Sequence, residues 1–401
     1  MKYSNKISMI YGLFYGSRML TGAINAVFLL NSGLEMRYIA ILQSIVTIGT
    51  FLLEIPTGYF SDKFSQKFSS VFGIILMGIH YFFMSFSPNI LLLVVAEVIL
   101  ALSGALLSGS FEAWVMYTVQ KEFPNEPIKI DYYNCLKDET NFFSTMFFGF
   151  LGSLIAYFNN GNYRIVYYVC SLFIVFVFIL SLFIPSEKIY KAKLLPFSFM
   201  DIFLVIKNKI IILFIIIEIS FVCTYQVVFF YWQPFFSILL KDKSFFNYKY
   251  EESLILGIVF LSYSGIRGIM TRFTRKYFLK KNIWKLVIFN VFLAIVSMLV
   301  FTYLDFSNII IYIVAFSLVQ GSIAVSSVLI NSKLIQEVPE NMISTSLSCI
   351  STISSIFSAG MLLVISKNIN MQNLLMYFRF CIFIYILIII EVFCMKSLKN
   401  N

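Results

Sequence analysis

Long apolar runs separated by short polar stretches are the main pattern along the chain. A helix that crosses a bilayer needs about 20 apolar residues, and each run is long enough to form one. We therefore predict twelve membrane-spanning helices, at residues 8–31, 38–60, 68–87, 89–111, 140–158, 164–184, 210–239, 254–271, 283–303, 308–330, 343–366 and 375–395. The predicted fold class is all-α and integral to the membrane.

A charged connector divides these runs into two sets of six. Residues 185–209 carry several lysines and two prolines in one of the longest polar stretches of the chain. Transporters are commonly built from two such repeated halves. We predict an N-terminal six-helix bundle at 1–184, a cytoplasmic connector at 185–209 and a C-terminal six-helix bundle at 210–401.

Charge gives the expected orientation. Lysine and arginine accumulate on the cytoplasmic side of membrane proteins, and placing the N-terminus inside puts most of the 30 basic residues in inner segments. Both termini are therefore expected to be cytoplasmic. The net charge of +10 is explained by these inner segments, so we expect no nucleic-acid partner.

Composition narrows the function classes. The chain is 60% hydrophobic and 12% charged, whereas soluble domains have roughly 25% charged residues, so a soluble globular protein is excluded. Twelve spans leave no room for a separate catalytic or nucleotide-binding domain. The first run lacks a signal-peptide cleavage pattern, and we expect it to remain as the first span.

Few residues offer enzymatic or metal chemistry. The six cysteines form no CxxC pair, and His80 is the only histidine, so we expect packing roles and neither a metal site nor a cofactor. No phosphate-binding loop or catalytic triad spacing is present, which excludes an ATP-driven pump. A polytopic membrane enzyme would need clustered His, Asp or Glu near one interface, and is the less favoured alternative.

The sharpest motif is EIPTGYFSDKFSQK at 54–67. It resembles the signature between helices two and three of the major facilitator superfamily, in the E-x-P-x5-D-x3-R-K variant of clostridial-type tetracycline efflux proteins and related drug exporters. The matching residues are Glu54, Pro56, Gly58, Asp62 and Lys67. Gln66 stands where arginine is usual and Ser65 where the common form has glycine, so the resemblance does not extend to the arginine ion pair of this gate.

A second stretch, SGALLSGSFEAW at 103–114, resembles the end of helix four in the same group. The resemblance implies a conformational gate made of the 54–67 motif and Glu112. Gly58 would allow close helix packing, and Asp62 would accept from amides at a helix N-terminus. The alternative is that Asp62 and Lys67 are solvated loop charges, while Glu54 and Glu112 are expected in the gate rather than in a proton relay.

Polar residues within the spans are the next candidates, because each charge costs roughly 2.5–3.5 kcal/mol at a helix centre. The resemblance implies that the first, fourth, seventh and tenth helices line a central cavity. The candidate residues for proton coupling or substrate contact on these helices are Arg18, Glu97, Glu218, Gln226, Trp232 and Gln320. For Glu218 the alternative is a snorkelling or paired carboxylate, and for Trp232 it is ordinary packing.

Arg18 and Glu97 lie about 15 Å and about 21 Å from the cytoplasmic side at 1.5 Å per residue. We predict that they form a buried pair, and that substrate or a proton competes for one partner. Separation of the pair would let Glu97 take up a proton and would couple transport to the proton gradient. A fixed pair that only positions the helices is the alternative.

These observations predict a secondary transporter of the bacterial plasma membrane that works by alternating access, with no cofactor. The resemblance implies proton-coupled export of a hydrophobic or amphipathic small molecule such as an antibiotic, by a monomeric antiporter. Three alternatives stay open: an importer on the same fold, sodium as the coupling ion, and a non-transporting sensor or immunity protein. A composition rich in Ile, Lys, Asn, Phe and Tyr indicates an AT-rich bacterial genome.

Overall fold

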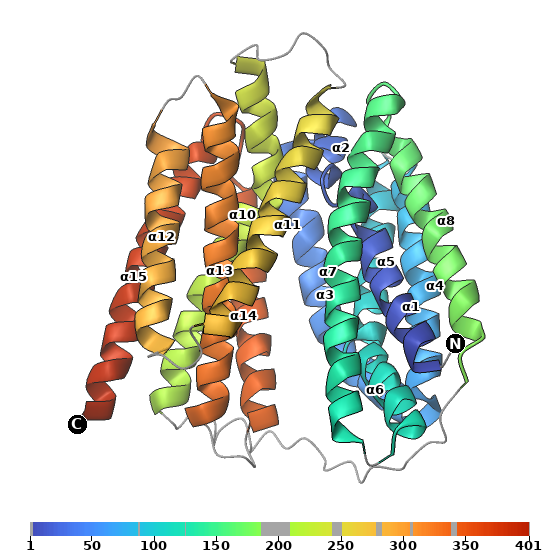
Figure 1. The fold of residues 1–401 in the computed structure, drawn as a ribbon. Helices are drawn as coiled ribbons and strands as arrows, with labels where there is room; N and C mark the ends of the chain where they lie inside the picture. Colours follow the sequence, from blue (N-terminus) through green and yellow to red (C-terminus); the bar gives the residue numbers. More distant parts are fainter. Residues whose placement is uncertain are drawn as a thin grey trace. The chain divides into compact units, whose positions relative to one another are not determined.

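The computed structural model describes residues 3–86, 89–124, 126–185, 209–242, 251–277, 283–304, 308–337 and 343–400. Within these ranges, the side chains of 55, 62, 127–131, 134–135, 209–210, 242, 275–277, 332, 335–337, 343–349 and 395–400 are not described. All regular structure in these ranges is helical (Figure 1). The chain divides into two compact units, Met1–Leu194 with Ser244–Leu261, and Leu195–Lys243 with Ser262–Asn401.

The first unit is a bundle of helices from the N-terminal part of the chain. Its elements are α1 (Tyr3–Arg18), η1 (Met19–Thr21), α2 (Asn25–Asn31), α3 (Met36–Phe64), α4 (Gln66–Met84), α5 (Ile90–Leu107), α6 (Ser110–Glu122), α7 (Pro127–Phe158) and α8 (Tyr163–Leu182). α1 packs along α7, α5 lies against α3 and α4, and α4 also contacts α8. The first part of α11 (Glu251–Tyr277) belongs to this unit as well.

The second unit holds the rest of α11 and five further helices. These are α10 (Lys209–Asp242), α12 (Ile283–Tyr303), α13 (Ile309–Glu337), α14 (Ile343–Ser366) and α15 (Leu374–Asn400). α10 packs against α13, α14 and α15, and α12 lies against α13 and α15. The packing of the second unit is therefore centred on α10 and α12.

The positions of the predicted spans agree with the helices, with shifts at their ends. The predicted runs at 283–303 and 343–366 coincide with α12 and α14. Eleven helical segments in the described part of the chain are long and apolar enough to cross a membrane, when Tyr3–Asn31 and Ile90–Glu122 are each counted as one segment. Ile350–Ser366 is a shorter apolar helix. The twelfth span, the cytoplasmic termini and the division at 184 and 209 stay predictions. Most of the 185–209 connector lies outside the described residues.

The first predicted span is not one continuous helix. α1 ends at Arg18, a 3₁₀ turn follows, and α2 begins at Asn25. Side chains satisfy the carbonyls at this break: the Tyr81 hydroxyl donates to the Arg18 carbonyl over 3.2 Å, and the Cys170 thiol donates to the Ser17 carbonyl over 3.2 Å. Broken helices are tolerated in membranes where neighbouring helices satisfy the freed backbone groups. α4 and α8 supply this satisfaction.

The fourth predicted span also ends earlier than the hydrophobic pattern indicated. α5 stops at Leu107, and α6 begins at Ser110 after Gly109, which has a φ of 70°. That backbone conformation suits glycine because it has no Cβ. The turn redirects the chain so that α6 contacts α1 and α4.

Small residues allow the closest helix packing. A Cβ built on Gly152 in α7 would lie 1.7 Å from the Leu20 carbonyl oxygen, and one on Gly16 in α1 would lie 2.4 Å from Ser144 Cβ. Small residues at helix interfaces let backbones approach closely in membrane proteins. The packing of α7 therefore depends on Gly16 where it contacts α1 and on Gly152 where it contacts η1.

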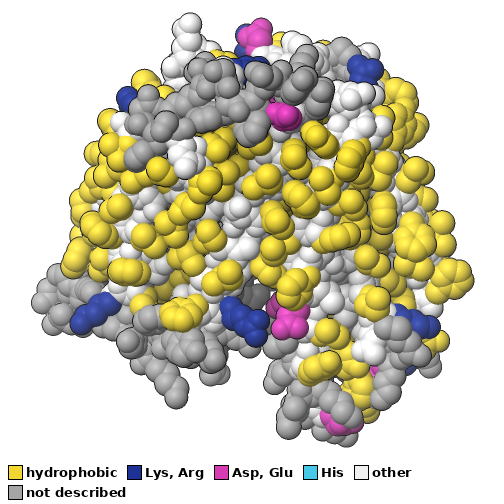
Figure 2. All heavy atoms as spheres, turned by 45° about the horizontal axis from the view of Figure 1, so that its top comes forward, with side chains coloured by type: hydrophobic (Ala, Val, Ile, Leu, Met, Phe, Trp, Pro, Cys, Tyr) yellow, Lys and Arg dark blue, Asp and Glu magenta, His cyan; other side chains and the backbone are white. Residues whose placement is uncertain are grey.

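Hydrophobic side chains cover much of the described surface (Figure 2). Large apolar residues are among the most exposed, including Phe158 and Phe183 at 75% and Leu172 at 68%. Exposed apolar surface of this extent suits a hydrocarbon solvent, because a soluble monomer rarely exposes large apolar patches. The surface agrees with the spans that the sequence predicts.

Candidate functional site

The predicted gate residue Glu54 joins α3 to the end of α5. The Ser108 hydroxyl donates to Glu54 Oε1 over 3.2 Å, and one helical turn later the Thr57 hydroxyl donates to the Ala105 carbonyl over 3.1 Å. Pro56 lies inside α3 between them. The two sequence motifs at 54–67 and 103–114 are therefore in direct contact.

The later part of the motif contacts α8. Lys67 Nζ donates to the carbonyls of Leu182 and Ile184, over 3.1 and 2.5 Å, and so caps the end of that helix. A cation there also interacts favourably with the helix dipole. Lys67 therefore has two carbonyl partners in this structure, and its part in a conformational gate stays a prediction.

The contacts predicted for two other motif residues, Gly58 and Asp62, stay predictions. A Cβ at Gly58 would meet no described atom of its own unit within 4 Å, so its close packing against another helix stays a prediction. The side chain of Asp62 lies outside the described residues, so its contact with a helix N-terminus stays a prediction.

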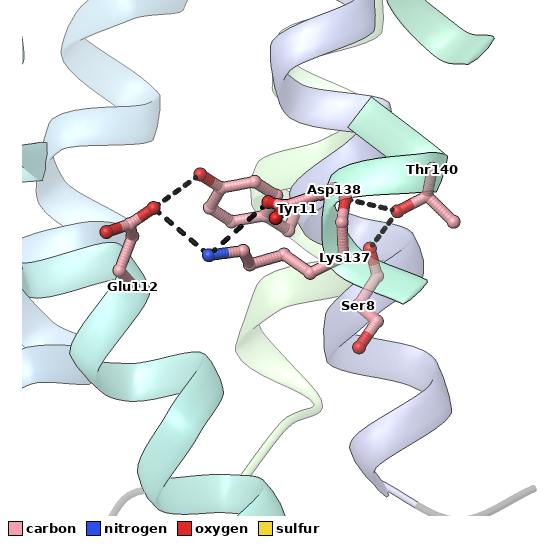
Figure 3. A network of polar contacts seen from close by, with 6 residues as sticks. All are labelled: Ser8, Tyr11, Glu112, Lys137, Asp138 and Thr140. Carbon is pink, nitrogen blue, oxygen red and sulfur yellow. Dashed lines mark hydrogen bonds and ion pairs between the residues drawn. The ribbon is translucent and has the colours of Figure 1, made fainter. Parts of the chain in front are cut away.

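Glu112 belongs to a polar network that joins α1, α6 and α7 (Figure 3). Lys137 Nζ lies 3.1 Å from Glu112 Oε1 and 3.6 Å from Asp138 Oδ1, and 5.2 Å from the centre of the Tyr11 ring. The Tyr11 hydroxyl donates to the same Glu112 oxygen over 3.1 Å. The Lys137 side chain is 8% exposed, so this cation depends on its partners.

A second acid of α6 fixes the start of α1. The Glu122 carboxylate accepts from the backbone amides of Tyr3, over 2.6 Å, and Ser4, over 3.2 Å, and from the Ser4 hydroxyl, over 2.6 Å. A carboxylate at this position satisfies free helix amides and complements the positive end of the helix dipole. With Glu112, it fastens α6 to α1 at two points.

We expect Glu112→Gln to lower the free energy of unfolding by about 1–2 kcal/mol, because it leaves a buried lysine without its nearest counter-charge. The effect should stay below the 3–5 kcal/mol of a fully buried pair, since the Glu112 side chain is 58% exposed. Thermal unfolding of the purified protein in detergent measures this loss of stability.

Glu35→Gln, which breaks the exposed pair with Arg37, is the matched control and should change stability by less than about 0.5 kcal/mol. Adding Lys137→Met to Glu112→Gln should recover part of the loss. Equal melting of Glu112→Gln and the wild type would contradict the network's structural role.

Arg18 lies at the end of α1, beside the helix break. Its guanidinium is 5.7 Å from the Phe14 ring centre and 5.6 Å from that of Tyr15. Its Nε is buried without a hydrogen-bond partner. The electrostatic neighbours of Arg18 include His80, Tyr81 and Cys170.

The predicted ion pair between Arg18 and Glu97 is not formed in this structure. The ion pairs within 4.0 Å among the described residues involve other side chains, on Glu35, Glu112 and Asp138. Glu97 in α5 is 7% exposed, and no described residue donates a hydrogen bond to it. Its carboxyl group does influence Tyr167 electrostatically. Glu97 is therefore a buried acid without a cationic partner in the described part of the protein.

Tyr167 and His80 complete the polar interior of the first unit. The Tyr167 hydroxyl donates to Asn25 Oδ1, which links α8 to α2, and His80 Nδ1 lies 2.9 Å from the Ala96 carbonyl. His80 is 4% exposed and contacts the Tyr81 ring edge-on. The packing role predicted for His80 agrees with these contacts.

In the second unit, the predicted cavity residues retain unsatisfied polar atoms. Glu218 Oε2 and Gln226 Oε1 on α10, and Gln320 Nε2 on α13, are buried without hydrogen-bond partners. Each such group costs about 1–3 kcal/mol. Trp232 differs, because it is 1% exposed and packs against the rings of Tyr263 and Phe316, as the packing alternative expects.

The predicted gate residues and the predicted cavity residues differ in their hydrogen bonding, which the sequence did not reveal. The described gate side chains that can form hydrogen bonds, Glu54, Lys67 and Glu112, have partners, whereas Arg18, Glu218, Gln226 and Gln320 keep buried polar atoms without one. The sequence analysis did not identify Lys137, which lies just before the predicted span at 140–158, or the contacts of Tyr81 and Tyr167. A lysine next to an acid at the start of an apolar run was the available signal for Lys137.

Comparison with known proteins places the fold. The structure resembles a mutant of the nucleoside transporter NupG, with a TM-score of 0.81 at 12% identity, covering 98% of this chain and 100% of that one. It also resembles a D-xylose–proton symporter, with a TM-score of 0.69 at 14% identity, covering 98% and 97%. At these identities the likeness concerns the fold alone.

Sequence comparison identifies the family. The chain is 26% identical over 259 residues to the uncharacterized MFS-type transporter YxaM of Bacillus subtilis (strain 168), which covers 58% of this chain and spans 60% of that relative's length. The family model described as Major Facilitator Superfamily matches residues 7–362. The chain therefore belongs to the major facilitator superfamily, and it is a multi-pass protein of the bacterial plasma membrane.

Proposed function

We propose that this chain is a secondary active transporter that works by alternating access and exports hydrophobic or amphipathic small molecules, including antibiotics, in exchange for protons. The proposal includes twelve spans in two six-helix halves, with both termini in the cytoplasm. The transporter acts as a monomer, without a cofactor.

One observation carries the proposal: polar atoms lie buried and unpartnered on three helices that the family resemblance assigns to the cavity. These are Arg18 Nε on α1, Glu218 Oε2 and Gln226 Oε1 on α10, and Gln320 Nε2 on α13. Polar and charged groups within the membrane commonly mark substrate and ion pathways, because placing them there costs free energy and they are rare without a function. A polar ligand or water would satisfy these atoms during transport.

Proton coupling is supported by Glu97 on α5, the helix that corresponds to the fourth predicted span. It is a carboxyl group, it is buried, and it has no cationic partner among the described residues. A group in this situation exchanges a proton only in a conformation that lets water reach it. Alternating exposure would therefore give it alternating access to protons. The export direction rests on the resemblance of the 54–67 motif to drug exporters.

The test is accumulation of fluorescent or labelled drugs in inverted membrane vesicles that contain the protein, after a proton gradient is imposed with the interior acidic. We expect uptake of at least one panel member, its collapse on addition of an uncoupler, and no uptake by vesicles from cells that lack the protein. Asp62→Asn should reduce the uptake if the motif forms a conformational gate.

Other outcomes point to the alternatives. Uptake only in right-side-out vesicles would indicate a proton-coupled importer, and dependence on sodium instead of protons would replace the coupling ion. Saturable binding without flux in either orientation would indicate a sensor or immunity protein on the same fold. Any of these results overturns the proposal of proton-coupled export.

A further inference from the structure

The Arg18 guanidinium has a positive charge that no described carboxylate neutralises. No acid among the described residues lies within 4.0 Å of it, and its Nε is buried without a hydrogen-bond partner. Its neighbours His80, Tyr81 and Cys170 carry no carboxylate. An unpaired charge within a membrane span is costly in free energy. A ligand that neutralises this charge would remove the cost, and its binding would be favoured accordingly.

Capping of α1 does not explain the charge. Arg18 lies at the C-terminal end of this helix, where a cation interacts favourably with the dipole. However, the carbonyls at the break are already satisfied by other donors: Tyr81 and Thr21 donate to the Arg18 carbonyl, and Cys170 to that of Ser17. The guanidinium is not needed as a donor there.

Two aromatic rings lie close to the guanidinium. Its Cζ is 5.7 Å from the centre of the Phe14 ring and 5.6 Å from that of Tyr15, and a guanidinium beside aromatic rings still directs its N–H groups outward in its own plane. Those donors form a fork that matches the two oxygens of a carboxylate. The ring contact does not occupy this edge. Among the described residues, Tyr81 shares a hydrogen bond with the Arg18 side chain, and the Nε donor stays without one.

Tyr15 adds an apolar surface next to this fork. Its ring stacks with Phe111 at 6.3 Å, and Phe111 stacks with Trp114 at 5.9 Å. Phe14, Phe111 and Trp114 are 0% exposed, whereas Tyr15 is only partly buried. The part of this ring cluster that a ligand can reach is therefore next to the Arg18 charge.

From this geometry we propose that the transported ligand carries an anionic group, of the carboxylate type, on an aromatic or apolar body, and that Arg18 binds the anionic group while Tyr15 contacts the body. This inference rests on the proposed transport function and names the substrate class for it. It narrows the proposed substrate class from amphipathic molecules in general to amphipathic anions.

The test measures binding of three naphthalene probes to the full-length protein in lipid nanodiscs by fluorescence titration. 1-Naphthoate and 1-naphthalenesulfonate are anions, and 1-naphthamide is a neutral compound of similar shape. The wild type should bind both anions about tenfold to one-hundredfold more tightly than the amide, as expected for hydrogen bonds between charged groups. Arg18→Gln should bind all three equally, and Arg18→Lys should retain part of the preference because it keeps the charge but not the fork.

Arg379→Gln is the matched control. Arg379 also lies over a tyrosine ring, at 4.3 Å from the centre of Tyr303, but its Nη2 donates to the Thr302 carbonyl over 3.1 Å. This variant should keep the wild-type preference for anions. Size-exclusion chromatography of each variant checks that it is folded.

A wild type that binds the amide as tightly as the anions, or binds neither anion, overturns the inference without any variant. Retention of the preference in Arg18→Gln overturns it as well. The transport proposal fails separately: preference for anions without proton-driven flux would keep the inference and refute transport. Flux of a cationic or neutral drug that is unaffected by Arg18→Gln would keep transport and refute the inference.

Discussion

Glu97→Gln is expected to reduce proton-driven accumulation of substrate to the level of vesicles that lack the protein. Glutamine preserves the size and much of the polarity of the side chain, but an amide cannot take up and release a proton in the physiological range. Glu97 is 7% exposed and has no cationic partner among the described residues, so its replacement breaks no ion pair there. The loss would therefore come from coupling rather than from unfolding.

The measurement that isolates coupling compares two assays on the same vesicles. Accumulation requires the proton gradient, whereas exchange of labelled for unlabelled substrate at equal concentrations does not. Glu97→Gln should lose accumulation and keep exchange. Glu391→Gln is the control, because Glu391 is a membrane carboxylate that accepts a hydrogen bond from Ser220 and is expected to retain accumulation. Wild-type accumulation by Glu97→Gln would show that another group carries the proton.

Gly152→Ala is expected to produce the largest loss of stability among single substitutions of a small residue. Its Cβ would lie 1.7 Å from the Leu20 carbonyl oxygen, 2.6 Å from the Leu20 carbonyl carbon and 2.9 Å from its Cα. These are backbone atoms, so no side-chain rotation relieves the clash. Overpacking typically costs about 1–3 kcal/mol and occasionally more, and we expect the upper end or beyond.

Thermal unfolding followed by fluorescence-detected size-exclusion chromatography measures this effect. Gly360→Ala is the control, because a Cβ at Gly360 meets no described atom within 4 Å and alanine is the better helix former. Gly360→Ala should therefore match or exceed the wild type. A Gly152→Ala protein that melts with the wild type would mean that α7 does not approach the broken segment of the first span this closely.

The break in the first span links the expected effect of Gly152→Ala to the proposed role of Arg18. It places Arg18 beside the ends of α1 and η1, and it brings the Leu20 backbone against Gly152. Tyr81 and Cys170 supply donors to the exposed carbonyls. A change at Gly152 is thus expected to disturb the segment that positions the proposed anion-binding arginine, although Gly152 itself has no side chain that could contact a ligand.

The long apolar runs and the composition determined the membrane class and the approximate position of the membrane-spanning helices. The reason is that every backbone polar group in a bilayer must be satisfied internally, so an apolar run of about 20 residues has few alternatives to a helix. The motif at 54–67 was likewise sufficient to indicate the family. α12 and α14 agree with their predicted ranges because a polar segment bounds each run clearly.

Tertiary structure decided the interactions that depend on distance between helices. The sequence showed that Arg18 and Glu97 both lie at membrane depth, but not that they remain apart, because depth along each helix leaves the direction of the side chain open. Lys137 lies just outside the predicted span at 140–158, and the structure buries it against Glu112 and Tyr11. The break after Arg18 was hidden for the same reason: its residues are as apolar as those of a continuous helix, and only donors from α4 and α8 make the interrupted backbone stable there.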